Sequence, residues 1–180
     1  LIDELLHRQL RGASGLLPPI TYRLRCALGA IPCVCGIPVD GRRVAAIRRA
    51  TGETEGKLCL IGGVIAYLES IEEALRRHFL EDLGVRIELC DGAFNRPWRV
   101  AEYGPRAEFN REVGKHAVAS IYLVRMIGEI RFGAKSCGPP EARGIEWFDL
   151  DSQPQISEFA DGEHEIYQQA LATVADWPRK

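Results

Sequence analysis

The apolar positions of residues 70–83 repeat with the period of an α-helix. They recur at spacings of three and four and share one face: Ile71, Ala74, Leu75, Phe79 and Leu83. Ser70 and Glu73 have the spacing of a capping box, in which each side chain satisfies an amide of the first turn. Gly84 supplies the left-handed residue that commonly ends a helix. The pattern therefore predicts a helix over 70–83 with one buried side.

Short β-rich stretches surround this helix. They are residues 20–28, 31–39, 43–49, 58–61, 86–90, 116–126, 129–132 and 144–150. The Asp-Gly step within residues 38–41 predicts a hairpin between two of them, and residues 95–115 are predicted to form a polar loop. A closing helix is expected over 158–177. This order of elements predicts an α+β domain in which a mixed β-sheet lies between helices.

The length of the chain fits one domain preceded by a short extension. Residues 1–12 have an amphipathic pattern, and a Gly-rich segment followed by Pro18 and Pro19 ends it. We expect residues 1–19 to be an N-terminal helical extension and residues 20–180 to be one folded domain. The 180 residues are enough to bury one sizeable core.

Composition and charge narrow the class of partner. With 46% hydrophobic and 27% charged residues, the chain is typical of a globular protein. A net charge of −2 provides no general attraction for polynucleotides, so recognition of phosphate requires a local site. The apolar stretch 117–124 is far shorter than the ~20 residues of a membrane helix, and no signal-peptide pattern is present. We therefore expect a cytoplasmic protein without a membrane or polynucleotide partner.

The six cysteines are expected to be reduced in such a protein. Cys33 and Cys35 are the pair closest in sequence, and strand alternation puts both on one face. No second Cys or His pair stands at zinc-ligand spacing, so two core thiols are the expected reading.

A group of polar residues on the predicted central helix points to chemistry. His78, Glu81 and Asp82 project from one side, because residues three and four apart are neighbours on a helix. Gly62 and Gly63 come just before, and glycines allow the backbone to approach a ligand closely. A strand, a Gly-containing loop and a helix with carboxylates can hold a hard divalent cation against phosphate oxygens. The alternative is a solvated helix face with ordinary ion pairs.

The spacing of these residues resembles the box of the Nudix hydrolases, G-x5-E-x7-R-E-U-x-E-E-x-G-U, where U is a bulky aliphatic residue. The matching positions are Gly63, Glu69, Arg77, Phe79, Glu81, Asp82, Gly84 and Val85. Phe79 replaces an aliphatic residue, Asp82 replaces a glutamate, and His78 stands where the family has a glutamate. The resemblance implies the Nudix α/β/α sandwich.

The resemblance also implies a function and a set of site residues. It implies a hydrolase that uses Mg²⁺ or Mn²⁺ and acts on a nucleoside diphosphate derivative, a small-molecule substrate. The metal ligands would be Gly62, Gly63, Glu81, Asp82 and Glu141. The catalytic residues would be Glu81, Glu141, His78 and Arg77, with Arg77 expected to orient Glu81 or Glu69. Relatives often pair as homodimers, and the same is expected here by analogy.

The reduced box is similar to that of the GDP-mannose mannosyl hydrolases, a Nudix branch that also lacks box glutamates. This similarity implies a nucleotide-sugar substrate, contacted by Arg48, Arg49 and His116. Ala142 occupies the position of the catalytic histidine of that branch, and Glu141 is the neighbouring acid that could replace it. The alternative for His116 is a structural histidine at a strand edge.

His78 leaves the mechanism open between three readings. It can be a neutral residue hydrogen-bonded to Glu81 or Asp82, a base that titrates near neutral pH, or the mark of a site that has lost its activity. The last reading gives the alternative function, a catalytically inactive Nudix-like module that binds and senses a nucleotide.

Overall fold

The structure is a computed structural model that describes residues 29–52, 54–66, 68–90, 93–104, 116–132, 142–160 and 162–177. The elements are β1 (Ile31–Asp40), β2 (Arg43–Arg49), β3 (Leu58–Cys59), β4 (Ile61–Val64), α3 (Ile71–Leu83), β5 (Arg86–Leu89), β6 (Arg99–Tyr103), β7 (Ala117–Ile127), β8 (Ala142–Phe148), a short 3₁₀ helix η2 (Ile156–Glu158) and α4 (Glu163–Ala175). The predicted extension 1–19, the predicted strand 20–28 and Glu141 lie outside the described residues.

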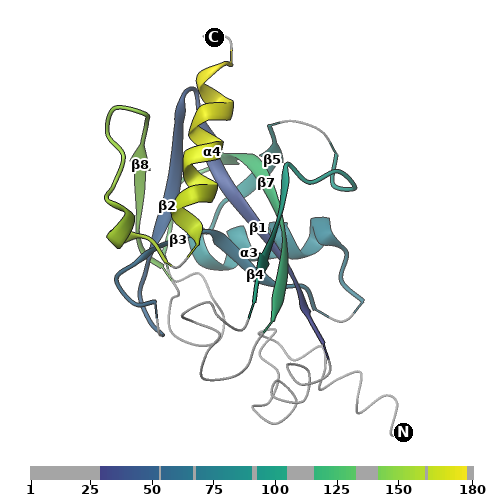
Figure 1. Cartoon of the computed structure of the whole chain (residues 1–180). Coiled ribbons are helices and arrows are strands. Elements are labelled where there is room, and N and C mark those ends of the chain that lie inside the picture. The colour runs from purple at the N-terminus through teal and green to yellow at the C-terminus, as the bar shows by residue number, and fades with distance from the viewer. Residues whose placement is uncertain are drawn as a thin grey trace, which may run out of the picture.

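The strands form a mixed sheet organised around β1 (Figure 1). β1 pairs in parallel with β7 and antiparallel with both β2 and β4. β5 and β6 pair antiparallel with β7, while β3 and β8 pair antiparallel with β2. The predicted hairpin between β1 and β2 is confirmed, with Val39 opposite Val44 and Asp40 opposite Arg43.

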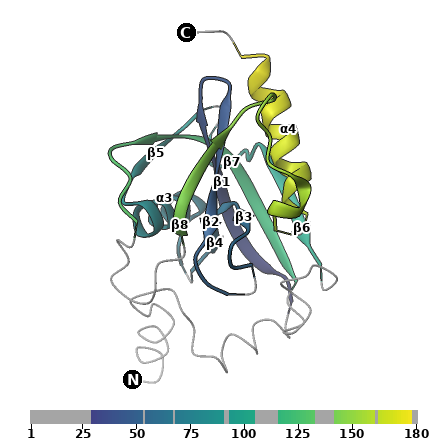
Figure 2. The same ribbon diagram turned by 90° about the vertical axis from the view of Figure 1, so that its left-hand side faces the viewer.

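Helices α3 and α4 cover opposite faces of this sheet (Figure 2). Successive strand residues point to opposite faces, so β1 contributes Val34 to the core beneath α3 and Ile37 to the core beneath α4. Cys33 and Cys35 both pack against the cluster beneath α4, as the alternation predicts. The predicted fold class, an α/β/α sandwich with a mixed sheet, is confirmed.

Helix α3 agrees with its predicted bounds and caps. The Ser70 side chain accepts from the Glu73 amide at 3.2 Å, and the Ser70 amide donates to the Glu73 carboxylate at 2.9 Å. Gly84 ends the helix with φ 68°. The predicted apolar face is buried against the sheet, with Leu75 and Phe79 fully inaccessible to solvent. This burial fixes which side of α3 remains for polar residues.

Phe79 reaches the sheet because β1 has a glycine beneath it. A Cβ on Gly36 would lie 2.6 Å from a ring carbon of Phe79, closer than such contacts occur. We predict that Gly36→Ala lowers the free energy of unfolding by about 2 kcal/mol, because the buried ring must shift. Urea denaturation measures the loss. The double variant Gly36→Ala/Phe79→Leu replaces the ring by a smaller side chain. It should lose less free energy of unfolding than the sum of the losses in the two single variants, and strict additivity would contradict the clash.

Several predicted elements need correction. Residues 129–132 are irregular rather than a strand, because Gly128 turns the chain with φ 110° and the Arg131 amide then donates to the Leu83 carbonyl at the end of α3. The predicted loop 95–115 contains β6, and the predicted strand 58–61 is divided into β3 and β4. The strand predicted at 144–150 is β8 at Ala142–Phe148, and α4 begins at Glu163, after η2. Of the described helices, none has the length and apolar character that crossing a membrane requires.

Candidate functional site

The Gly62–Gly63 pair lies within β4 and has a packing role. Gly62 pairs with Cys35 of β1 and has φ 150°, a conformation that favours glycine. A Cβ at this position would lie 2.1 Å from the Val34 carbonyl oxygen. A Cβ on Gly63 would lie 2.9 Å from Cε1 of His78. Both glycines are therefore required by their neighbours in the fold, and metal binding by their carbonyl groups stays a prediction.

Arg77 of α3 forms a bidentate ion pair with Glu69, which lies in the segment between β4 and α3. Arg77 donates from Nε and Nη2 to the two carboxylate oxygens of Glu69, at 2.7 and 2.8 Å. Glu69 also accepts from the Ala66 amide at 2.8 Å. Burial disfavours the charge on Glu69, but the hydrogen bonds from Arg77 and the Ala66 amide, together with the charge of Arg77, outweigh it and lower the pKa of this carboxyl group. Two-pronged pairing of this kind fixes orientation as well as distance.

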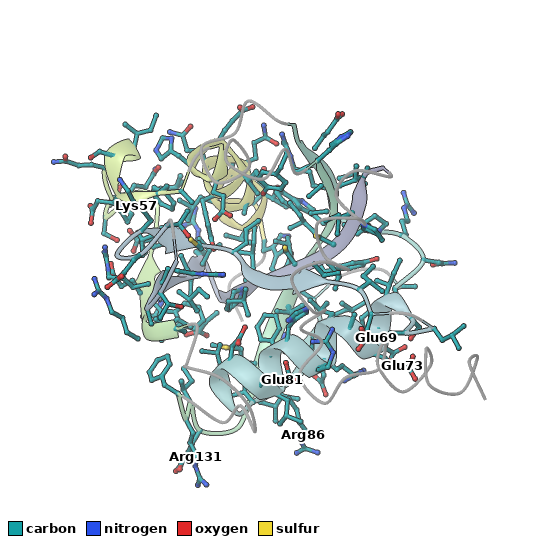
Figure 3. All side chains as sticks on the ribbon, turned by 90° about the horizontal axis from the view of Figure 1, so that it is seen from below. Lys57, Glu69, Glu73, Glu81, Arg86 and Arg131 are labelled. Atoms are coloured by element: carbon teal, nitrogen blue, oxygen red, sulfur yellow. The ribbon has the colours of Figure 1, made fainter. Side chains whose placement is uncertain are left out.

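The same arginine reaches one of the predicted site acids. Its Nη1 lies 3.3 Å from a carboxylate oxygen of Glu81, one helical turn further along α3. Glu69 lies near the start of α3 and Glu81 further along it (Figure 3). These contacts are those of a positioning residue, in agreement with the expectation that Arg77 orients Glu81 or Glu69. A direct catalytic role for Arg77 stays a prediction.

His78 is buried, with 9% of its surface exposed, and its ring packs on Gly63. Its Nε2 lies 3.3 Å from the Val64 carbonyl oxygen, which also accepts from Arg77 Nη2 at 3.1 Å. A carbonyl only accepts, so this hydrogen bond requires the proton on Nε2. Two consecutive helix residues thus hold one carbonyl group at the exit of β4. The geometry favours a structural role for His78, with a backbone acceptor that the sequence does not indicate.

The two adjacent acids of α3 have different surroundings. The Glu81 side chain is 25% exposed, whereas Asp82 is 2% exposed. Carboxylate and carbonyl oxygens are donors of the kind that Mg²⁺ prefers, so the residues suit the metal in type. Within the described ranges, no group of three or more His, Cys, Asp or Glu side chains is arranged to hold a metal ion. Glu141, the further ligand that the sequence predicts, lies outside the described residues.

The residues predicted to contact substrate have partners within the protein. Arg48 donates from Nε to Glu146, from Nη1 to the Gly56 carbonyl at 2.7 Å, and from Nη2 to Glu158 at 3.2 Å. The hydrogen bond to Glu146 is the main reason that the pKa of Arg48 is raised. These contacts join β2 to β8 and η2. These contacts give Arg48 a structural role, and substrate contact by Arg48 stays a prediction.

Arg49 and His116 lie at strand ends. The Arg49 amide donates to the Lys57 carbonyl at 2.9 Å, which closes the loop between β2 and β3. His116 precedes β7, and its Nε2 lies 2.9 Å from a carboxylate oxygen of Glu102 on β6. This is the geometry of the structural strand-edge histidine. Substrate contact by Arg49 and His116 stays a prediction.

One buried acid is not indicated by any motif of the sequence. Glu163, the first residue of α4, is 9% exposed and accepts from the Leu60 amide at 2.6 Å. Its position four residues before the buried Tyr167 is the available signal, since both lie on the side of α4 that faces the sheet. A charged residue at a helix start is otherwise typical of an exposed position.

Comparison with known families decides the family of this chain. The model described as "Domain of unknown function (DUF4916)" matches residues 31–176. The chain belongs to the DUF4916 family. The match covers the whole described sandwich of this DUF4916 protein, from the first residue of β1 to just beyond α4.

Solved structures similar to this DUF4916 protein include Nudix hydrolases. A MutT Nudix hydrolase from Burkholderia pseudomallei is 25% identical, with a TM-score of 0.60 over 78% of this chain and 97% of the other. A possible asymmetric diadenosine tetraphosphate hydrolase from Jonesia denitrificans is 25% identical, with a TM-score of 0.67 over 85% and 99%. The implied Nudix fold is thereby confirmed, and these neighbours support a hydrolase.

A curated relative extends the comparison to a named activity. The ADP-ribose pyrophosphatase of Methanocaldococcus jannaschii is 23% identical over 138 residues, which cover 75% of this DUF4916 protein and 71% of the relative. The predicted likeness to the GDP-mannose branch is not confirmed by these comparisons.

Proposed function

We propose that this protein is a hydrolase of nucleoside diphosphate derivatives that requires Mg²⁺ or Mn²⁺. The observation that carries the proposal is the contact of Arg77 with both Glu69 and Glu81. This contact connects three residues of the box. It holds the partly exposed side chain of Glu81 beside the segment that follows β4. Such a braced acid is suited to a ligand with fixed geometry.

The residues proposed to hold the metal ion are Glu81, Asp82 and Glu141, with carbonyl groups of Gly62 or Gly63. When bound, the ion would neutralise charge on the diphosphate and make its cleavage easier. The described residues orient the groups of the proposed site. Arg77 fixes the Glu81 carboxylate, and the hydrogen bonds of Arg77 and His78 to the Val64 carbonyl fix the backbone next to Gly63.

The names of the relatives guide the choice of substrates. ADP-ribose and diadenosine tetraphosphate come from the curated relative and the structural neighbour. GDP-mannose and other nucleotide sugars are included because the reduced box resembles that of the GDP-mannose mannosyl hydrolases. All three classes contain phosphates joined in a chain and a nucleoside, so one panel tests them together. Labelled water, H₂¹⁸O, would then show whether the oxygen enters at phosphorus or at the sugar carbon.

Hydrolysis by the purified full chain with Mg²⁺ or Mn²⁺ is the test of this function. We expect product from at least one compound of the panel, and a loss of kcat of about 100-fold in Glu81→Gln with an unchanged melting temperature. Glu72→Gln is the matched control, since Glu72 is exposed on the same helix and pairs with Arg76. It should retain wild-type kcat.

Two results would overturn the proposal. One is the absence of product from every compound with either metal. The other is unchanged turnover in Glu81→Gln. Tight binding measured by calorimetry without turnover, unaffected by Asp82→Asn, would instead identify a binding module.

A further inference from the structure

The start of α4 and the residue Ala160 before it are hydrogen-bonded to β3 and to Leu60, the residue that follows β3. The Ala160 amide donates to the Leu58 carbonyl at 3.0 Å, and the Tyr167 hydroxyl donates to the Cys59 carbonyl at 3.1 Å. The Glu163 carboxyl group accepts from the Leu60 amide at 2.6 Å. Leu60 is the residue between β3 and β4, two positions before Gly62. The attachment of α4 therefore lies directly upstream of the proposed site.

Glu163 is the ionisable member of this attachment, and its surroundings disfavour a charge. The residue is 9% exposed, and its carboxyl group accepts a hydrogen bond from the amide of Leu60. Among the described residues, the titratable and charged groups around it are Arg49 of β2, Cys59 of β3, Tyr103 of β6 and Tyr167 of α4. Cys35 of β1 interacts with both tyrosines, and Cys33 interacts with Tyr103. Of these described groups, Arg49 carries the positive charge that offsets a negative charge on Glu163.

We infer that Glu163 is a pH-sensitive positioning residue, which holds the first turn of α4 on the β3–β4 junction when it is neutral and loosens that contact when it ionises. The neutral carboxyl group keeps its carbonyl oxygen for the Leu60 amide, so protonation preserves the hydrogen bond. Ionisation does not remove the hydrogen-bond acceptor, but it places a negative charge in a buried site. Contact with water would stabilise that charge. Opening of the α4 start supplies that water.

The direction of the pH effect follows from the burial. Burial raises the pKa of Glu163 from its ordinary 4.5 to about 7, against the opposing effects of the Leu60 amide and Arg49. The folded state therefore holds the proton more tightly than the unfolded state. The contribution of Glu163 to stability is complete below pH 4.5 and is lost as the pH rises towards 7. Above that range it is constant.

NMR of the wild-type full chain tests this inference without any substrate. We expect the Glu163 side-chain carbon to titrate with a midpoint near pH 7. The hydrogen-exchange protection factor of the Leu60 amide should fall about tenfold or more between pH 5 and pH 8, after correction for intrinsic exchange. A midpoint near the ordinary value of 4.5 would overturn the inference.

Two variants separate the role of Glu163 from a general effect of charge. Glu163→Gln retains the acceptor and cannot ionise, so the Leu60 protection factor should become independent of pH. Glu165→Gln removes the same charge two residues away, where the side chain is 73% exposed, and should keep the wild-type pH dependence. A pH dependence that persists in Glu163→Gln would contradict the inference.

Catalysis provides a further readout that rests on the proposed function. If the loosened contact disturbs the backbone before Gly62, kcat should decline above pH 7 in the wild type and be retained in Glu163→Gln, with KM less affected. A failure of hydrolysis in all variants would count against the proposed function alone, because the NMR results do not depend on it.

Discussion

Replacing Gly62 with alanine is expected to lower the free energy of unfolding by more than about 4 kcal/mol, enough to prevent folding of a marginally stable domain. The new Cβ would lie 2.1 Å from the Val34 carbonyl oxygen and 2.7 Å from the Cys35 Cα. Both are backbone atoms of β1, which pairs with β7 over eight positions and cannot move independently. The φ of 150° adds strain for any residue with a side chain.

Expression yield, circular dichroism and urea denaturation measure this loss. Gly144→Ala is the matched control, because Gly144 is also in a strand and has open space where a Cβ would be. It should change stability by less than about 1 kcal/mol. A Gly62→Ala protein as stable as the wild type would show that β4 does not lie against β1 in this register.

The second large effect is expected at Arg77. We predict that Arg77→Met lowers the free energy of unfolding by about 3 kcal/mol, because it leaves the mostly buried carboxylate of Glu69 without its counter-charge. The Glu69 side chain is 13% exposed and receives two of its hydrogen bonds from Arg77. The exposed arginine Arg131 also faces a glutamate, so Arg131→Met serves as the control and should cost less than about 0.5 kcal/mol.

A double-mutant cycle and pH test the cause. Glu69→Gln/Arg77→Met should be more stable than Arg77→Met, since no buried charge remains. The pKa of Glu69 is lowered in the folded state, so its stabilising pair with Arg77 is present above the ordinary pKa of 4.5 and is lost as the pH falls through the folded value. The coupling energy from urea denaturation should therefore decrease in acid. A coupling near zero at pH 7 would contradict the pairing.

The parts of the fold that were predictable are those determined by neighbours in sequence. The capping box, the apolar face and the Gly84 stop of α3 all lie within fifteen residues, and the structure has each of them. By contrast, β6 exists because Arg99–Tyr103 can pair with β7, a contact between distant segments that its weak alternation does not announce. Residues 129–132 have strand-like composition, yet the Arg131 amide is used by the end of α3.

The candidate site shows the same division. The resemblance of the box implied that Arg77 orients Glu81 or Glu69, and Arg77 has a hydrogen bond to each of these acids. The reason for Gly62 was not predictable, because the atoms that exclude a side chain belong to β1, far earlier in the chain. The partners of Arg48 are similarly remote, since Glu146 and Glu158 lie 98 and 110 residues away. A sequence motif identifies side chains of the right chemical type. Contacts with residues far away in the sequence determine which of those side chains can still bind a ligand.

The attachment of α4 also has a consequence for association between molecules. β3 lies at the end of the sheet path and pairs with β2 on one side. On its other side, Leu58 forms a parallel bridge with Phe159, and Ala160 and Glu163 occupy the Leu58 carbonyl and the Leu60 amide that a foreign strand would otherwise use. A strand edge that is left exposed can pair with another chain and start aggregation. A truncated chain that lacks α4 should therefore accumulate as insoluble oligomers, with the uncovered edge as the point of contact.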